Sequence, residues 1–167
     1  MVDAALLQAV ASIRTPLLTQ AAVSLTALGS VSFTLVAIAG LYLGGERDTA
    51  VLATVAAGVT AVVEMAVNAA VARPRPAIVP VLLPTGSGAS FPSGHTALAF
   101  MLATVLSRRY GRTAPLYVLA AFVGVSRVYL GLHYPSDVAA GAVLGTAAGL
   151  LVYRYRETIL SGVNRYI

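Results

Sequence analysis

The chain has 167 residues, of which 58% are hydrophobic and only 10% are charged, whereas a soluble domain carries charge on about a quarter of its residues. This composition excludes an ordinary water-soluble domain and predicts an integral membrane protein, and the lack of cysteine excludes disulfides and thiolate chemistry. The net charge of +5 comes entirely from arginines at the ends of apolar runs, so membrane topology explains it better than nucleic-acid binding does.

The first part of the chain predicts an interfacial segment followed by one or two membrane helices. Residues 4–13 are apolar but too short to cross a bilayer, which takes about 20 residues, and no basic stretch precedes them as in a signal peptide. No charge appears from Thr15 to Gly45, and Pro16 can occupy the first turn of a helix there. Gly29-Ser30 could divide this interval into two short helices; the alternative is a single span with a leader.

A longer membrane helix is expected over residues 49–72, after a polar turn at residues 46–48. Either Asp48 or Thr49 can cap its first turn. Glu64 and Asn68 are its strongly polar residues, and their spacing of four places them on one face. We therefore expect this helix to turn a polar face toward the protein interior.

Residues 73–92 interrupt the helical pattern with five prolines and two glycines, which predicts a loop. The loop is largely apolar, so we expect it at the membrane surface. Three more helices are expected over residues 93–108, 113–130 and 136–155. Gly141, Gly145 and Gly149 recur at a spacing of four in the last one, which favours close packing within the chain over a dimer contact.

The arginines predict the orientation in the membrane, because basic residues gather on the cytoplasmic side. The larger set is expected to be cytoplasmic and consists of Arg47, Arg108, Arg109, Arg112, Arg154, Arg156 and Arg165. The smaller set lies at the opposite helix ends and consists of Arg73, Arg75 and Arg127. The loop over 73–92 and the turn over 127–136 are therefore expected to meet on the outer face.

A polar cluster is predicted on that outer face. It contains both histidines of the chain, His95 and His133, together with Asp137, Arg75 and Arg127. In a chain this poor in charge, such a cluster indicates a functional site.

The residue types of the cluster suit phosphoryl transfer. Guanidinium groups bind phosphate oxygens and stay charged. The sequence Pro92-Ser93-Gly94-His95 is typical of a helix start, where free backbone N–H groups can receive an anion, with a hydroxyl from Ser93 and close backbone approach at Gly94. One histidine can be a nucleophile if a carboxylate such as Asp137 supports it, and the other can protonate the leaving oxygen.

Three motifs in this region resemble the signature of the type 2 phosphatidic acid phosphatase (PAP2) superfamily, which includes the vanadium haloperoxidases. The first motif, usually Lys, six residues and Arg-Pro, corresponds to Asn68 through Arg75-Pro76. The second, Pro-Ser-Gly-His, is present unchanged at residues 92–95. The third, Ser-Arg, five residues, His, three residues and Asp, is unchanged from Ser126 to Asp137.

The resemblance implies an all-α, polytopic transmembrane bundle of five or six membrane helices, formed by residues 1–167 as one domain. It implies a reaction without metal or other cofactor, in which His133 attacks phosphorus to form a phosphohistidine and Asp137 holds His133. His95 would protonate the leaving group and then assist water. The phosphate oxygens would be held by Arg75, Arg127, Ser93 and the Gly94 N–H.

One position departs from the family pattern, because Asn68 stands where the family usually has lysine. An amide could still contact a phosphate oxygen, but more weakly. Arg73 could supply the missing charge, or it could be a surface residue at the membrane interface. Glu64, one turn before Asn68, could hydrogen-bond Asn68 or Arg75, or it could line an inner polar seam.

The predicted function is that of a cell-membrane phosphatase with its site on the extracytoplasmic side. The expected partner is a membrane lipid substrate, such as an isoprenyl diphosphate, phosphatidic acid or phosphatidylglycerol phosphate, and no nucleic acid. The alternatives are a phosphotransferase that uses the same intermediate and a non-catalytic membrane protein that inherited the fold. A soluble haloperoxidase is disfavoured because the predicted spans are too apolar.

Overall fold

The computed structural model describes residues 2–84 and 88–163 of the chain. The helices in this part are α1 (Val2–Ser12), α2 (Pro16–Ala27), α3 (Val31–Leu43), α4 (Arg47–Val71), α5 (Gly94–Tyr110), α6 (Thr113–Tyr129), α7 (Pro135–Arg154) and α8 (Arg156–Val163). The segments between them are loops and turns, which confirms the prediction of an all-α fold. Helix α8 was not predicted.

The uncharged interval after residue 14 forms two helices, which decides between the two predicted alternatives. Thr15 caps α2 by accepting a hydrogen bond from the Leu18 N–H, and Pro16 occupies the first turn. Ser30 caps α3 in the same way, and the two helices meet at a bend of 54°. A Cβ on Gly29 would lie 2.6 Å from the His95 carbonyl oxygen, so glycine allows this bend to pack against the start of α5.

Helix α4 begins two residues before its predicted start, and the predicted cap is wrong. Glu46 occupies the N-cap position without a side-chain cap. Thr49 instead donates to Glu46 Oε2 at 3.2 Å, and Asp48 lies in the first turn. Glu46 also accepts hydrogen bonds from Arg109, which link the start of α4 to the end of α5.

Helix α5 is the most buried helix and packs against α4, α6 and α7. The α7 glycines make this possible. A Cβ would lie 2.5 Å from the Ser93 carbonyl at Gly141 and 2.8 Å from Thr104 Cβ at Gly149, and at Gly145 it would overlap the Ala97 carbonyl. The expected packing within the chain is therefore confirmed.

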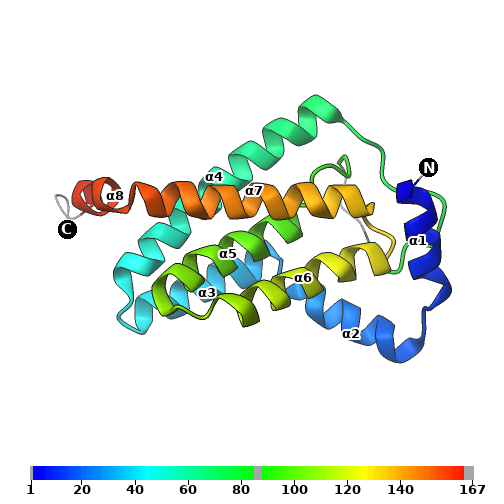
Figure 1. Ribbon diagram of the computed structural model, residues 1–167, viewed down its shortest axis with the longest axis horizontal. Coiled ribbons are helices and arrows are strands. Elements are labelled where there is room, and N and C mark those ends of the chain that lie inside the picture. Colours follow the sequence, from blue (N-terminus) through cyan, green and yellow to red (C-terminus); the bar gives the residue numbers. More distant parts are fainter. Residues whose placement is uncertain (1, 85–87, 164–167) are drawn as a thin grey trace.

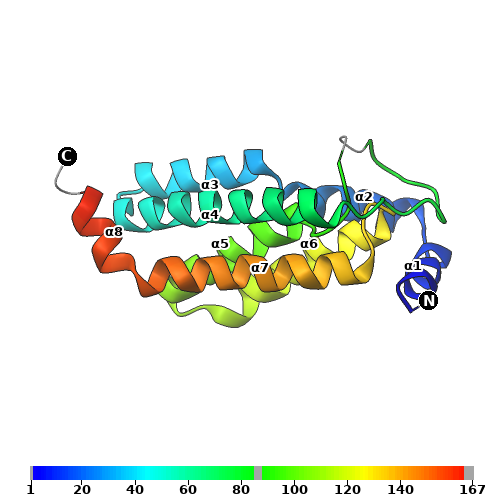
Figure 2. The same ribbon diagram turned by 90° about the horizontal axis from the view of Figure 1, so that it is seen from above.

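The helices form an elongated bundle, with α1 and α8 at opposite ends (Figure 1). Figure 2 shows α3 and α4 side by side along one flank, α7 on the other flank and α5 between them. By length and composition α4 and α7 can each cross a membrane, and the bent pair α2–α3 is a third candidate span. Helices α5 and α6 have 17 residues each, so the count of five or six spans stays a prediction.

The helix ends place the two arginine sets at opposite ends of the bundle, as expected. Arg75 and Arg127 lie at the end that also holds α1, while the larger set lies near the turns α3–α4 and α5–α6 and the end of α7. Arg165 lies outside the described residues, as do residues 85–87 of the predicted loop.

Candidate functional site

A cavity of about 330 Å³ lies at the α1 end of the bundle, where loop 73–92, the start of α5 and the end of α6 meet. Its lining consists of Thr26, Glu64, Arg75, Leu83, Pro84, Ala89, Pro92, Gly94, His95, Arg127, Leu132 and His133. Five of the eight predicted site residues are among them. Segments as far apart in the sequence as Thr26 and His133 therefore converge at one polar cavity.

His133 is held in one tautomer by the backbone. Its Nδ1 lies 2.7 Å from the Ser90 carbonyl oxygen, so Nδ1 carries the proton and donates it there. Its Nε2 then presents a lone pair toward the arginines, at 3.2 Å from Arg75 Nη1 and 3.4 Å from Arg127 Nη2. Burial, reinforced by the positive charges of Arg127 and Arg75, lowers the pKa of His133 to about 3. The imidazole is therefore neutral, and its Nε2 lone pair, which accepts from the arginines here, is the one that a nucleophile uses.

Asp137 lies close to His133, as predicted, but makes no direct hydrogen bond to it. Its Oδ2 is 3.9 Å from His133 Nδ1, beyond hydrogen-bond range. Oδ2 instead accepts from the Tyr134 N–H at 2.8 Å, which caps α7, and Oδ1 pairs with Arg73 at 2.6 Å. The Asp137 carboxylate thus caps the start of α7, and the hydrogen bond to His133 Nδ1–H is accepted by the Ser90 carbonyl oxygen. Asp137 remains close enough to stabilise a positive charge on it.

The two cavity arginines have unused hydrogen-bonding capacity. Arg75 Nη1 donates to the Leu132 carbonyl at 3.0 Å, and Arg127 Nη1 donates to Thr26 Oγ1 at 2.9 Å. The buried Nε atoms of both arginines meet no acceptor among the described residues. Arg127 is buried and Arg75 is half-buried. Two such cations, which approach the same imidazole nitrogen and have free N–H groups, form a site suited to an anion with several oxygens.

The start of α5 supplies the other predicted groups. Gly94 and His95 line the cavity, and the first N–H groups of the helix are there. Ser93 is fully buried behind the wall, where its N–H donates to the Asp137 carbonyl at 3.0 Å and its Oγ accepts from Thr96. The structure therefore shows Ser93 fixing the start of α5 to α7, and it does not place the hydroxyl at the cavity.

Asn68 also lies outside the cavity lining. Its Nδ2 donates to the carbonyl oxygens of Ala89 and Phe91 at 3.1 and 3.3 Å. Its side-chain amide therefore holds the loop that leads into α5, and a contact of Asn68 with phosphate stays a prediction. A short amide at this position reaches the neighbouring backbone instead of the cavity.

Arg73 is paired with two carboxylates of the protein. It pairs with Asp137 at 2.6 Å and with Asp3 of α1 at 2.9 Å, and it stacks 4.0 Å from the Tyr134 ring centre. Its charge is therefore directed at α7 and α1. Glu64, by contrast, does line the cavity, with its carboxylate beside Gly94.

Sequence reasoning missed three groups at this site: the Ser90 carbonyl, the Thr26 hydroxyl and Asp3. The first is a backbone atom in a loop, and the second lies on an apolar helix about a hundred residues from its partner. No motif indicates either one. For Asp3, the sequence does offer a signal, because it is an isolated charge directly before an apolar segment.

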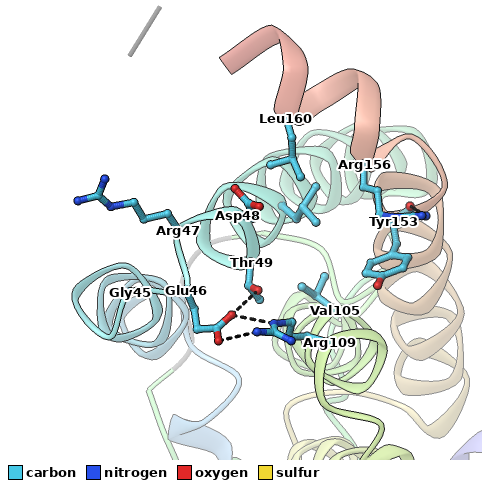
Figure 3. A pocket seen from close by; sticks show the side chains of 11 residues that line it. Gly45, Glu46, Arg47, Asp48, Thr49, Val105, Arg109, Tyr153, Arg156 and Leu160 are labelled. Carbon is cyan, nitrogen blue, oxygen red and sulfur yellow. Dashed lines mark hydrogen bonds and ion pairs between the residues drawn. The ribbon is translucent and has the colours of Figure 1, made fainter. Parts of the chain in front are cut away.

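A second polar cavity, of about 470 Å³, lies at the opposite end, around the α3–α4 turn and the end of α5. Figure 3 shows Glu46 bound to both Arg109 and Thr49, while Arg47 points away from the cavity. Arg109 donates to both Glu46 oxygens at 2.8 Å, so its charge is compensated. This cavity contains no histidine among its lining residues. Its paired charges are better explained as a structural contact between the α3–α4 turn and the end of α5 than as a reaction site.

Comparisons with known proteins agree with the motifs. The family model of the PAP2 superfamily matches residues 48–160. The structure of LpxE from Aquifex aeolicus superposes with a TM-score of 0.81 at 32% identity, over 90% of this chain and 93% of that one. The transmembrane PAP2-type phosphatidylglycerolphosphate phosphatase of Bacillus subtilis gives 0.82 at 29% identity, over 95% and 86%.

Among curated relatives, the undecaprenyl-diphosphatase BcrC of Bacillus subtilis is 34% identical over 113 residues, which cover 62% of this chain and 58% of that protein. The phosphatidylglycerophosphatase B of Bacillus subtilis is 30% identical over 94% of this chain and 84% of that protein. Of several other curated relatives, BcrC included, the chain spans between 20% and 58% of the length.

Proposed function

Since the chain belongs to the PAP2 superfamily and is an integral membrane protein, we propose that it is a phosphatase that releases phosphate from a membrane lipid phosphate or an isoprenyl diphosphate. Two of its relatives are named for such substrates, undecaprenyl diphosphate and phosphatidylglycerol phosphate. All residues of the second and third motifs are present in this chain.

One observation carries the proposal: His133 Nε2 faces Arg75 and Arg127 while its Nδ1–H is held by the Ser90 carbonyl. This arrangement combines a neutral nucleophile of fixed tautomer with two cations that can bind phosphate oxygens. The unused Nε–H groups of the arginines are the donors that a phosphoryl group would satisfy.

In the first half of the reaction, the Nε2 lone pair attacks phosphorus and the bond from phosphorus to the leaving oxygen breaks. His95, which lines the same cavity, donates a proton to the leaving oxygen. The phosphohistidine carries positive charge on its ring, which the Ser90 carbonyl and the Asp137 carboxylate at 3.9 Å stabilise. Arg75, Arg127 and the Gly94 N–H stabilise the charge that develops on the phosphoryl oxygens.

In the second half, His95 takes a proton from water as the water oxygen attacks phosphorus. The bond from phosphorus to Nε2 breaks, inorganic phosphate forms and His133 returns to its neutral state. The positions of His95 and His133 on one cavity wall support this division of roles. Ser93 supports the start of α5 from behind, and Asn68 and Asp137 support the two loops that carry the reacting residues.

The arginine distribution supports an extracytoplasmic site in the cell membrane. The described part of the larger set lies at the bundle end opposite the cavity, and basic residues are retained on the cytoplasmic side. We therefore orient the α1 end and the cavity toward the outside.

The proposal is tested by a phosphate-release screen of the purified protein with isoprenyl diphosphates, phosphatidic acid, phosphatidylglycerol phosphate and soluble esters, with and without a chelator. We expect lipid hydrolysis that is insensitive to the chelator and absent in His133→Ala. Full activity of His133→Ala would refute the nucleophile, and strong inhibition by the chelator would refute the metal-free reaction. Transfer of labelled phosphate to an added lipid or sugar acceptor would identify a phosphotransferase.

A further inference from the structure

Glu64 is a charged residue of the phosphate cavity that the proposed reaction leaves without a role. It belongs to the second half of α4, is half-buried and lines the cavity together with Arg75 and Arg127. Among residues 2–84 and 88–163 its carboxylate takes part in no ion pair. A carboxylate repels the phosphate that the cavity would bind, and an ionisable residue within a membrane helix indicates a function. A role in the choice of substrate accounts for such a residue.

The carboxylate of Glu64 lies on the side of the cavity where the leaving group is released. A Cβ built on Gly94 would lie 3.5 Å from Glu64 Oε1, so the carboxylate stands against the start of α5, next to His95. In-line displacement puts the leaving oxygen on the side of phosphorus opposite the attacking Nε2 of His133. Since His95 protonates that oxygen in the proposed reaction, Glu64 faces the leaving group rather than the transferred phosphoryl group.

The cations of the cavity are gathered around the nucleophile instead. Its two lining arginines both approach His133 Nε2, at 3.2 and 3.4 Å, where the transferred phosphoryl group would bind. Arg73 is paired with carboxylates of α1 and α7. Asn68, at the position where the PAP2 superfamily usually has lysine, is uncharged and donates to the loop before α5. Among the lining residues that the structure describes, the leaving-group side therefore has a negative charge and no cation.

We infer that Glu64 makes this site selective for phosphomonoesters over diphosphates. In both reactions the bond from phosphorus to the leaving oxygen breaks and His95 supplies a proton to that oxygen. The leaving group of a monoester is then a neutral alcohol. The leaving group of a diphosphate is a second phosphate, which keeps negative charge and would face the Glu64 carboxylate without a cation to bind it. This inference rests on the proposed function and narrows its substrates to lipid monophosphates.

Substrates that share one hydrocarbon part isolate the effect of the leaving group. Farnesyl monophosphate and farnesyl diphosphate form one such pair, and phosphatidic acid and diacylglycerol diphosphate form a second. The assay measures kcat/KM of the full chain in detergent from initial rates, with the reaction of each diphosphate followed by the monophosphate that it yields. The wild type should have the higher kcat/KM for the monophosphate of each pair.

Glu64→Gln removes the charge and keeps the shape of the side chain. It should raise kcat/KM for the diphosphate relative to the monophosphate by roughly tenfold, the size expected for repulsion between two charges at a partly hydrated site. Glu64→Asp keeps the charge and should retain most of the wild-type preference. Glu46→Gln is the matched control, because it removes a carboxylate at the other end of the same helix, outside the cavity lining, and should leave the ratio unchanged. Thermal unfolding in the same detergent checks that the variants are folded.

The inference is overturned if the wild type prefers the diphosphates, or if Glu64→Gln changes the ratio no more than Glu46→Gln does. An equal loss on both members of a pair in Glu64→Gln would show a structural role for the residue and would overturn the inference as well. If the wild type releases phosphate from none of the four lipids, the proposed function fails and the inference falls with it. A wild type that is active but insensitive to the charge at Glu64 refutes the inference alone, so the two failures are distinguishable.

Discussion

Arg73 forms two ion pairs, one with a buried carboxylate and one with a partly exposed carboxylate. Substitutions at these residues can therefore measure how much each ion pair contributes to stability. Arg73 pairs with Asp137, whose side chain is fully buried, and with Asp3, whose side chain is 27% exposed. Arg73→Ala leaves the Asp137 carboxylate with its Tyr134 N–H bond but without its cation. We expect this change to lower both the stability of the fold and the rate of phosphate release.

The magnitude follows from the two environments. A hydrogen bond to a charged buried group contributes about 1.5–3 kcal/mol, whereas an exposed ion pair contributes about 0–1 kcal/mol. Arg73→Ala should therefore cost roughly 2–4 kcal/mol of unfolding free energy, and Asp3→Asn at most about 1 kcal/mol. Tyr134→Leu removes the stacking of Arg73 on the ring and measures that contribution separately.

The assay is thermal and denaturant unfolding of the purified variants in one detergent, followed by kcat with a lipid phosphate. Asp137→Asn should be less damaging in the Arg73→Ala background than in wild type, because the carboxylate has already lost its partner. Arg73→Lys should recover part of the stability. The reasoning is refuted if Arg73→Ala is no more destabilising than Asp3→Asn, or if the effects of Arg73→Ala and Asp137→Asn simply add.

Three further changes test other parts of the structure. Because the pKa of His133 is lowered to about 3 in the folded protein from 6.5 when unfolded, its contribution to stability is complete above about pH 6.5 and is lost as the pH falls toward 3. Unfolding free energy should fall across this window by up to roughly 5 kcal/mol, and an unchanged pH slope in His133→Gln would contradict the assignment. Asn68→Leu keeps the volume but removes both donors to the loop, so we expect a loss of about 1–3 kcal/mol together with a lower kcat, and unaltered kinetics would show that the loop needs no such support. Gly145→Ala should destabilise by about 1–3 kcal/mol because its Cβ would overlap Ala97, while Gly58→Ala should be neutral or stabilising in the same melts; equal effects would contradict the close packing of α5 on α7.

Much of the fold was predictable because its signals are local. The prolines and glycines of residues 73–92 ended α4, and Gly29-Ser30 marked the bend between α2 and α3. The spacing of the α7 glycines predicted their contact with a neighbouring helix. Charge spacing and the motifs also selected five residues that line one cavity. For the loop, the bend and the helix contact, the physical cause lies in the residue itself, as a missing side chain or a fixed backbone angle.

The partners of the site residues were less predictable because they depend on how distant segments meet. His133 is held by the backbone carbonyl of Ser90, an atom that every residue possesses. Asp137 is used by its own helix cap and by Arg73, which the third motif does not contain. Asn68 binds the backbone of a loop about twenty residues away. Such hydrogen bonds leave no pattern in a single sequence.

Trapping the phosphoenzyme tests the central claim most directly. The wild-type protein is mixed with a lipid substrate that carries labelled phosphate, quenched in alkali within one turnover and digested, and the labelled peptide is sequenced by mass spectrometry. We predict an alkali-stable, acid-labile phosphohistidine at His133, absent from His133→Ala and accumulating in His95→Ala with a substrate whose leaving group needs no proton. Label on another residue, or phosphate release at full rate without any labelled enzyme, would contradict the account.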